Sequence, residues 1–218
     1  MKINLNLKEL LLVVILLACL PSCNNNNKTK LVYQNADTTK TTSSYKLDVP
    51  QGWNVERIPF PVDFAPGINY TGVEDLRFTP DWEDLTSEEH WSYAFLWWLD
   101  EKPKIDADIL QENLTAYYSG LVKGNIVQRS IPQIKIVSTV VTIKKMETST
   151  DDLTTFGGTI SMLDYIAQSP ITLNCLVHVK GCDTQNHTAV FFEISPKQYD
   201  HPVWQKLNNL SAGFKCGK

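Results

Sequence analysis

The sequence lacks an apolar run long enough to cross a membrane, and it lacks an excess of basic residues. The longest apolar stretch, residues 10–20, is about half as long as a membrane-spanning helix. The 218 residues include 20 Lys and Arg against 24 Asp and Glu, so the formal net charge is −4. Nucleic-acid-binding proteins normally present a basic stripe. We therefore expect no nucleic-acid partner and no polytopic membrane protein.

Sequence motifs for cofactors, metals and covalent catalysis are also missing. The chain contains no Gly-x-Ser-x-Gly, no phosphate-binding glycine-rich loop and no dinucleotide fingerprint. Its four histidines, at positions 90, 178, 187 and 201, are dispersed, and no Cys-x-x-Cys pair occurs. We expect no cofactor, no metal site and no catalytic residues. Because triads assemble from distant residues, these absences lower the expectation of an enzyme without ruling one out.

The first 22 residues have the layout of a bacterial export signal. Lys2 and Lys8 give a positive start, and the apolar run that follows is too short for a mature spanning helix. The segment ends in Leu20-Pro21-Ser22-Cys23. An ordinary signal peptide with a chance cysteine is the alternative, but the polar tract directly after the cysteine favours a more specific interpretation.

The tetrapeptide resembles a lipobox, the cleavage and lipidation motif of bacterial lipoproteins. The resemblance implies that residues 1–22 are removed and that Cys23 carries thioether-linked diacylglycerol, usually with an N-acyl chain. Several acyl chains anchor a protein stably, whereas one chain gives marginal binding. We expect a cell-envelope lipoprotein that contacts the membrane through Cys23, in the outer membrane (periplasmic or surface face) rather than the inner.

A polar tether separates this anchor from the folded domain. Residues 23–44 are rich in Asn, Thr and Ser and almost free of large apolar side chains, so they cannot repay their ordering entropy. With 43% hydrophobic and 20% charged residues the chain can nevertheless bury a core. We expect a single domain over residues 45–218.

The hydrophobic periodicity predicts an α+β domain. Aromatic residues at 91, 93, 95 and 97 recur at a spacing of two, which indicates a central strand covered on both faces. A long middle helix is expected from Asp106 or Asp108 to about Val122, with Gly124 as its stop, and a short C-terminal helix after His201. The three prolines in residues 57–66 predict an extended loop. The remaining strands are expected at 45–49, 72–78, 133–145, 154–165, 171–179 and 188–195. Together they predict a mainly antiparallel sheet of about six strands flanked by the two helices.

This order of elements resembles the PsbP-like fold, a group named for an accessory protein of photosystem II. A strand ending in Pro50-Gln51-Gly52-Trp53 and a final helix before Gly213-Phe214 carry the resemblance at residue level. It covers roughly residues 45–215. The resemblance implies a sandwich of sheet and helices in a small accessory or binding module with no shared catalytic apparatus.

Three cysteines remain in the expected mature domain, Cys175, Cys182 and Cys216. The strand at 188–195 leads away from the loop that holds Cys182, and the helix after residue 201 leads back toward it. Eight strand residues cover ~26 Å and eleven helical residues ~17 Å, so the C-terminal tail can reach the loop. This geometry favours a Cys182–Cys216 disulfide, in an oxidising compartment, and a buried free Cys175. A Cys175–Cys182 bridge is the main alternative.

The most unusual segment is residues 74–101, where carboxylates alternate with tryptophans. Nine carboxylates and one basic residue, Arg77, lie in it. The carboxylates are Glu74, Asp75, Asp81, Glu83, Asp84, Glu88, Glu89, Asp100 and Glu101. A solvated acidic loop beside a buried strand is the plain interpretation. A cation site from Asp81, Glu83 and Asp84 and a sugar site, in which aromatic rings stack on the substrate, are alternatives.

We therefore expect a membrane-anchored, non-enzymatic binding or accessory module whose partner is an envelope protein or a glycan. The candidate binding surface consists of Asp81, Trp82, Glu83, Asp84 and Glu88. The alternative is a glycan-active hydrolase or carbohydrate-binding protein that uses the same segment. A concave cleft with two facing carboxylates and an aromatic platform would favour the alternative.

Overall fold

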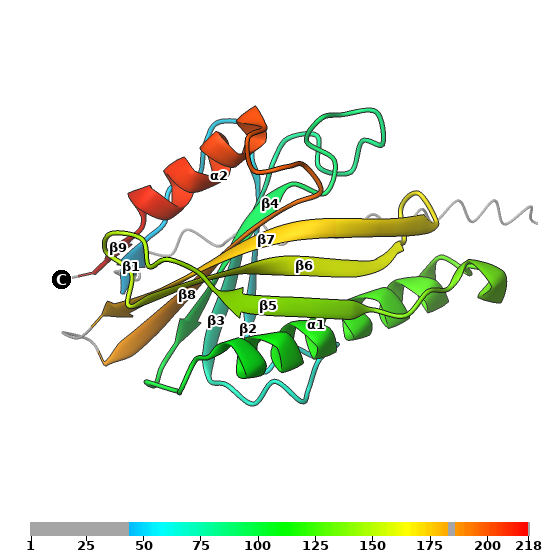
Figure 1. Ribbon diagram of the computed structural model, residues 1–218. Helices are drawn as coiled ribbons and strands as arrows, with labels where there is room; N and C mark the ends of the chain where they lie inside the picture. Colours follow the sequence, from blue (N-terminus) through cyan, green and yellow to red (C-terminus); the bar gives the residue numbers. More distant parts are fainter. Residues whose placement is uncertain (1–43, 183–185, 218) are drawn as a thin grey trace, which may run out of the picture. The chain divides into compact units, whose positions relative to one another are not determined.

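The computed structural model describes residues 44–182 and 186–217 (Figure 1). The predicted signal peptide, the predicted lipidation residue Cys23 and the predicted tether up to residue 43 lie outside this range. The described residues form an α+β domain dominated by antiparallel strands, which confirms the predicted fold class.

A seven-stranded antiparallel sheet forms the centre of the domain, in the order β2-β3-β4-β8-β7-β6-β5. A separate two-stranded ribbon joins the two ends of the domain, β1 with β9. The strands of the sheet are β2 (Asn54–Pro59), β3 (Gly72–Phe78), β4 (Tyr93–Leu99), β5 (Val140–Lys145), β6 (Thr154–Asp164), β7 (Ser169–Cys182) and β8 (His187–Ser195). The ribbon consists of β1 (Tyr45–Lys46) and β9 (Lys215–Cys216).

The seventh strand is β2, which the sequence had predicted to be partly loop. Asn54–Pro59 pairs with β3 over its whole length, so the prediction of an extended loop from residue 57 was wrong for its first three residues. β2 is an edge strand, and its only proline, Pro59, is its last residue. At an edge a proline removes no ladder hydrogen bond from the interior of a sheet, which is why this segment can pair.

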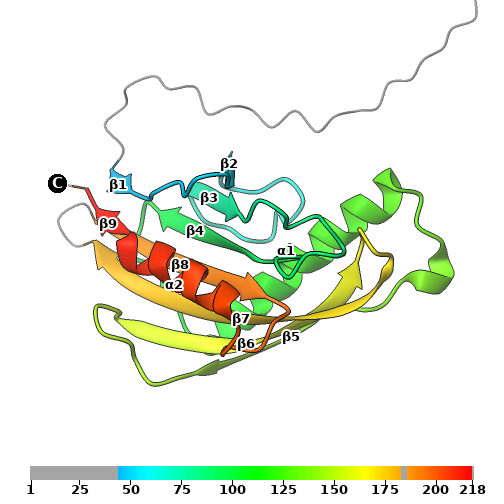
Figure 2. The ribbon, with the colours of Figure 1, turned by 90° about the horizontal axis from the view of Figure 1, so that it is seen from above.

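The helices α1 (Ala107–Gln128) and α2 (Pro202–Gly213) cover opposite faces of the sheet (Figures 1 and 2). As predicted, Asp106 caps α1, since its carboxylate accepts a hydrogen bond from the Ile109 amide at 2.9 Å. Gly124 does not end α1, which continues to Gln128. The left-handed residue that stops the helix is Ser130, with φ of 51°, and the Ile131 amide bonds back to the Ile126 carbonyl. Neither helix is long and apolar enough to cross a membrane.

The segment after α1 also departs from its predicted strand. Gln133–Lys135 forms a 3₁₀ turn, η1, in which the Lys135 amide bonds to the Pro132 carbonyl. Only the C-terminal part of the predicted strand 133–145 pairs, as β5. The alternating apolar residues that predicted one long strand therefore belong to two elements, a 3₁₀ turn and a short edge strand.

The central strand β4 separates two hydrophobic clusters, as the spacing of its side chains predicted. Tyr93, Phe95 and Trp97 pack in the larger cluster, under α1. Ala94, Leu96 and Trp98 pack in the smaller cluster, under α2. We call these two sides of the sheet the α1 face and the α2 face.

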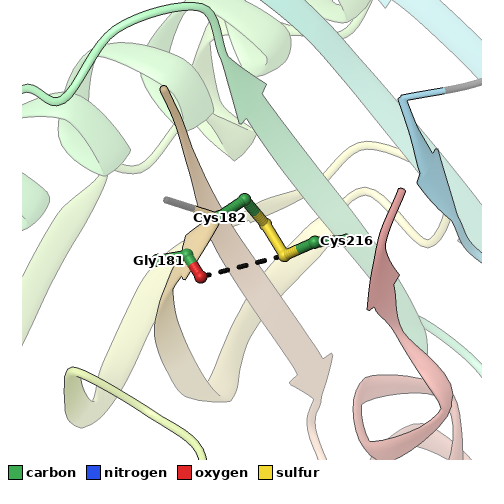
Figure 3. The surroundings of a disulfide bond; sticks show 3 residues. All are labelled: Gly181, Cys182 and Cys216. Atoms are coloured by element: carbon green, nitrogen blue, oxygen red, sulfur yellow. Dashed lines mark hydrogen bonds between the residues drawn. A yellow bond between two sulfur atoms is a disulfide. The ribbon is translucent and has the colours of Figure 1, made fainter. Parts of the chain in front are cut away.

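A disulfide ties the C-terminal strand β9 to the end of β7 (Figure 3). Cys182, at the end of β7, is bonded to Cys216 in β9, with Cα atoms 5.7 Å apart. The Cys216 sulfur also lies 3.8 Å from the Gly181 carbonyl oxygen. Cys175 is a buried free thiol. This is the pairing that the strand and helix lengths favoured over Cys175–Cys182.

Candidate functional site

The structure divides the acidic segment 74–101 into a buried part and an exposed part. Glu74 and Asp75 belong to β3 and are buried inside the domain. Asp81, Glu83, Asp84 and Glu88 are exposed in the connection between β3 and β4. The expectation of a solvated acidic loop is therefore right for residues 81–89, which we call the acidic loop, and for Asp100 and Glu101 at the far end of the segment, which are also exposed.

Trp82 is a correction to the predicted binding surface, because its side chain points into the core. The residue is 8% exposed, and its ring packs 4.6 Å from Phe78 and 6.0 Å from Trp91. The Trp91 amide donates to the Trp82 carbonyl at 2.9 Å, which folds the acidic loop back on itself. Trp97 and Trp98 are buried as well. None of these tryptophans presents an exposed ring on which a sugar could stack.

The acidic loop is partly neutralised by the segment at the start of α2. Glu88 forms an ion pair with Lys197 and lies 3.4 Å from His201 Nε2, and Glu89 pairs with Lys206. Asp84 accepts hydrogen bonds from the backbone amide and the hydroxyl of Thr86. By contrast, Asp81 and Glu83 form no ion pair within the part of the chain that the structure describes. They are the two carboxylates that the loop leaves available.

Glu74 lies on the α1 face, completely buried among aromatic residues. Trp97 Nε1 donates a hydrogen bond to Glu74 Oε1 at 3.1 Å, whereas Oε2 finds no hydrogen-bond partner among the described residues. Burial, only partly offset by hydrogen bonds from Trp97 and Tyr117, raises the pKa of Glu74 to about 7. This carboxyl is stable in the fold in its neutral form, and no cationic side chain of the described residues contacts it.

Asp75 and Arg77 form a buried ion pair on the α2 face, and the pair holds the N-terminal segment of the domain. The Tyr45 hydroxyl donates to Asp75 Oδ2 at 2.7 Å. The Arg77 guanidinium donates to the backbone carbonyls of Leu47 and Asp48 at 3.3 and 3.2 Å. These bonds join Asp75 and Arg77 of β3 to Tyr45, Leu47 and Asp48. The cluster therefore stabilises the position of β1 and the residues after it.

A cavity of about 460 Å³ opens on the α2 face, at the end where the disulfide lies. It draws no residue from the acidic segment 74–101. Its walls come from the β5–β6 connection, β7, the last turn of α2, and β9. The lining residues are Ser149, Thr150, Asp151, Asp152, His178, Lys180, Gly181, Asn208, Ser211, Ala212, Phe214, Lys215 and Cys216. Most of these side chains carry hydrogen-bonding groups.

One carboxylate on the cavity floor gathers three donors. The Asp152 side chain is fully buried, and it accepts hydrogen bonds from Thr155 Oγ1 at 2.6 Å and from His178 Nδ1 at 2.7 Å. Lys180 Nζ lies 2.8 Å from its other oxygen. Burial by itself would raise the pKa of Asp152, but these donors outweigh burial and lower it. Asp152 is therefore held as an anion.

A second buried carboxylate lies behind His178. His178 Nε2 is 3.4 Å from Glu193 Oε1, and Glu193 is completely buried under α2, where neither of its oxygens accepts a hydrogen bond from a described residue. Burial alone would lower the pKa of His178, but Glu193 and Asp152 outweigh it and raise that pKa. Burial raises the pKa of Glu193. The imidazole thus lies between two carboxylates.

No local sequence pattern predicts this cavity, because its lining residues are spread from 149 to 216. His178 was predicted to be a half-buried structural residue of a strand; it is buried, with its side chain at the cavity floor. One usable signal was present. His178 and Lys180 lie on one side of a strand whose other side is apolar from Leu173 to Val179, and such a polar pair requires partners when it is buried.

Two comparisons with known proteins found no relative of the chain. Neither a scan against protein-family models nor a search of curated proteins finds a match to the chain. The candidate site is therefore defined by its geometry: a polar cavity with charged groups on its floor, and an acidic loop elsewhere on the domain.

Proposed function

We propose that the chain is a bacterial cell-envelope lipoprotein, anchored to the membrane by lipid on Cys23, whose domain is a non-enzymatic binding module. The lipobox-like tetrapeptide and the polar tract after it support the anchor. The disulfide between Cys182 and Cys216 agrees with an oxidising compartment such as the periplasm or the cell surface. The outer membrane is the favoured location, and the relation to the PsbP-like group remains a prediction.

The observation that carries the binding function is the polar cavity on the α2 face. Ligand sites are concave and place a few polar groups so that they converge on the ligand. Here hydroxyls of Ser149 and Ser211, the amide of Asn208 and the ammonium of Lys215 line one space. The lining contains as many carboxylates as ammonium groups, Asp151 and Asp152 against Lys180 and Lys215. A small polar ligand with both donors and acceptors fits this lining best.

Two neighbouring asparagines of α2 provide a matched test of the cavity. Asn208 lines it, whereas Asn209, the next residue, does not, and both are exposed. Asn208→Phe fills the cavity, and Asn209→Phe adds the same bulk outside it. A thermal-shift screen with amino acids, dipeptides and small saccharides should find a compound that stabilises the wild type and Asn209→Phe but not Asn208→Phe. Equal stabilisation of all three proteins would reject the cavity as the site.

The anchor has a separate test. Cys23→Ala should abolish incorporation of labelled palmitate and release the protein from the membrane fraction. Cys19→Ala removes a cysteine of the predicted signal peptide and should leave both properties unchanged. If Cys23→Ala remained labelled and membrane-bound, the lipoprotein proposal would fail, while the cavity proposal would still stand.

The acidic loop is a second candidate surface, for a macromolecular partner. It lies at the end of the sheet opposite to β1 (Figure 1). In the sequence, β1 directly follows the predicted tether. Asp81 and Glu83 are exposed in the acidic loop and form no ion pair with any described residue. In-cell crosslinking of the wild type and of Asp81→Asn/Glu83→Gln tests this surface. Loss of a specific crosslinked envelope protein in the variant supports it, and an unchanged crosslinking pattern argues against it.

A further inference from the structure

The β5–β6 connection, residues 146–153, is attached to the domain at its two ends and, in its middle, around Asp152. We call this segment the latch loop. Seven of its eight residues are exposed, whereas the Asp152 side chain is buried. At the ends, backbone bonds run from Met146 to Thr155 and from Leu153 to Val179. In the middle, the Ser149 amide donates to the Thr155 hydroxyl at 2.9 Å, and this hydroxyl donates in turn to Asp152. How firmly the middle of the loop is held therefore depends on Asp152 and on the Thr155 hydroxyl that it shares with Ser149.

The cluster around Asp152 draws on three strands and is covered by α2. β6 contributes Thr155 and β7 contributes His178 and Lys180. β8 contributes Glu193, which lies behind His178 and is fully buried beneath α2, and neither of its carboxylate oxygens accepts a hydrogen bond from a described residue. The cluster thus reaches from the latch loop, on one side of the cavity, to the buried carboxyl beneath α2 on the other.

The charges of the cluster balance only when it holds one proton in addition to that on Lys180. Asp152 and Glu193 carry two negative charges when ionised, and Lys180 supplies one positive charge. A proton on either His178 or Glu193 supplies the balance, since the two groups lie 3.4 Å apart. Losing that proton leaves an uncompensated negative charge in the interior, which is strongly destabilising. The other charged groups lining the cavity, Asp151 and Lys215, are exposed to solvent, which screens them.

We propose that Asp152, His178 and Glu193 form a proton-sensitive latch, which holds the latch loop and the last turn of α2 together across the cavity and loosens when its shared proton is lost. The latch concerns the fold around the cavity, so it holds whether or not the cavity binds the ligand proposed above. In the closed state the cavity keeps the walls described here. In the loosened state the contacts of His178 with Asp152 and Glu193 no longer connect the latch loop to the residues beneath α2.

The direction of the pH response follows from the two groups that share the proton. The pKa of His178 is raised, so its contribution to stability is complete below its ordinary value of 6.5 and is lost as the pH rises through the raised value. The pKa of Glu193 is raised too, so its contribution also falls as the pH rises. Both groups act in the same sense: the latch is closed in mild acid and loosens above neutral pH.

Hydrogen exchange of the disulfide-intact domain tests this proposal without a ligand. Protection factors, corrected for intrinsic exchange at each pH, are compared between pH 6.5 and 8.5 for the latch loop, the last turn of α2 and the buried strand β4. In the wild type the loop and α2 amides should lose protection relative to β4 by about tenfold or more, which corresponds to a loss of about 1.4 kcal/mol in local stability.

The decisive variant is His178→Gln/Glu193→Gln. It removes the shared proton and keeps the charges of Asp152 and Lys180 balanced, so it avoids the buried unpaired charge that His178→Gln alone would leave. Its loop protection should be independent of pH. His187→Gln, which changes a histidine of β8 paired with exposed Asp100, should behave as the wild type. The proposal is overturned if the double variant keeps the wild-type pH dependence, or if the wild type shows none.

Discussion

The two faces of the sheet differ in the partners of their buried carboxyls. On the α1 face a large aromatic cluster surrounds Glu74, which contacts no cation among the described residues and is stable in neutral form. On the α2 face the cluster is smaller, and the buried carboxylates have cationic partners: Asp75 has Arg77, and Asp152 has Lys180 and His178. The α1 face thus supplies cohesion, whereas the α2 face holds charge beside a cavity. Binding chemistry is therefore expected on the α2 face.

The largest effect should come from emptying the aromatic cluster of the α1 face. Phe95 is fully buried and stacks on Phe192 at 4.3 Å and on Tyr117 at 5.6 Å. Phe95→Ala should lower the free energy of unfolding by about 3–5 kcal/mol, because it removes buried area and leaves a void. Urea unfolding measures this loss. A loss below about 1 kcal/mol, as seen at surface positions, would contradict the cohesive role of this face.

Opening the disulfide on the α2 face should have the next largest effect. The bond closes a loop with a sequence separation of 34, for which the chain-entropy relation gives about 3–4 kcal/mol. Cys216→Ser should lose about this much in urea unfolding, and a reducing agent should destabilise the wild type but not the variant. Equal sensitivity of both proteins to reduction would show that the bond does not support the domain.

Glu74→Gln should stabilise the domain above neutral pH and so sharpen the contrast between the faces. The folded pKa is about 7 against an ordinary value of 4.5, so the fold favours the protonated form. Stability is fully present below pH 4.5 and falls as the pH rises through 7, by about 3 kcal/mol in total. The uncharged glutamine avoids this loss. Its advantage at pH 8 should disappear at pH 4, as thermal unfolding at both pH values will show. A constant difference across that range would mean that Glu74 does not titrate in the fold.

The smallest effect is expected in the acidic loop. Asp81→Asn/Glu83→Gln changes two exposed side chains that form no ion pair with described residues, so the free energy of unfolding should stay within about 0.5 kcal/mol of the wild type. Thermal unfolding at low and moderate salt provides the measurement. A larger loss would indicate that these carboxylates support the fold and would weaken their assignment to a binding surface.

Much of the fold was readable from local patterns. Local sequence and known rises per residue were enough to predict three features: the alternation in β4, the cap at Asp106 and the pairing of Cys182 with Cys216. The errors arose where contacts with other parts of the chain determine the secondary structure. β2 became a strand because β3 was available to pair with it, and α1 passed Gly124 because a later residue, Ser130, adopted the left-handed conformation.

The candidate site was much less predictable than the fold. Trp82 looked like part of an exposed surface because it lies among carboxylates, but one side chain of an otherwise exposed loop can turn into the core, and sequence does not say which. The cavity combines Asp152, His178 and Asn208, which come from three separate elements. No local periodicity brings such residues together, so only the three-dimensional arrangement identifies them.

The central claim is that the cavity of the α2 face binds a small polar ligand. Amide chemical-shift mapping of the isotope-labelled domain, with the panel of amino acids, dipeptides and small saccharides, tests it most directly. The account predicts a compound whose shifts cluster at residues 149–152, 178–181 and 208–216 and vanish in Asn208→Phe. Shifts confined to the acidic loop, or none with any compound of the panel, would contradict it.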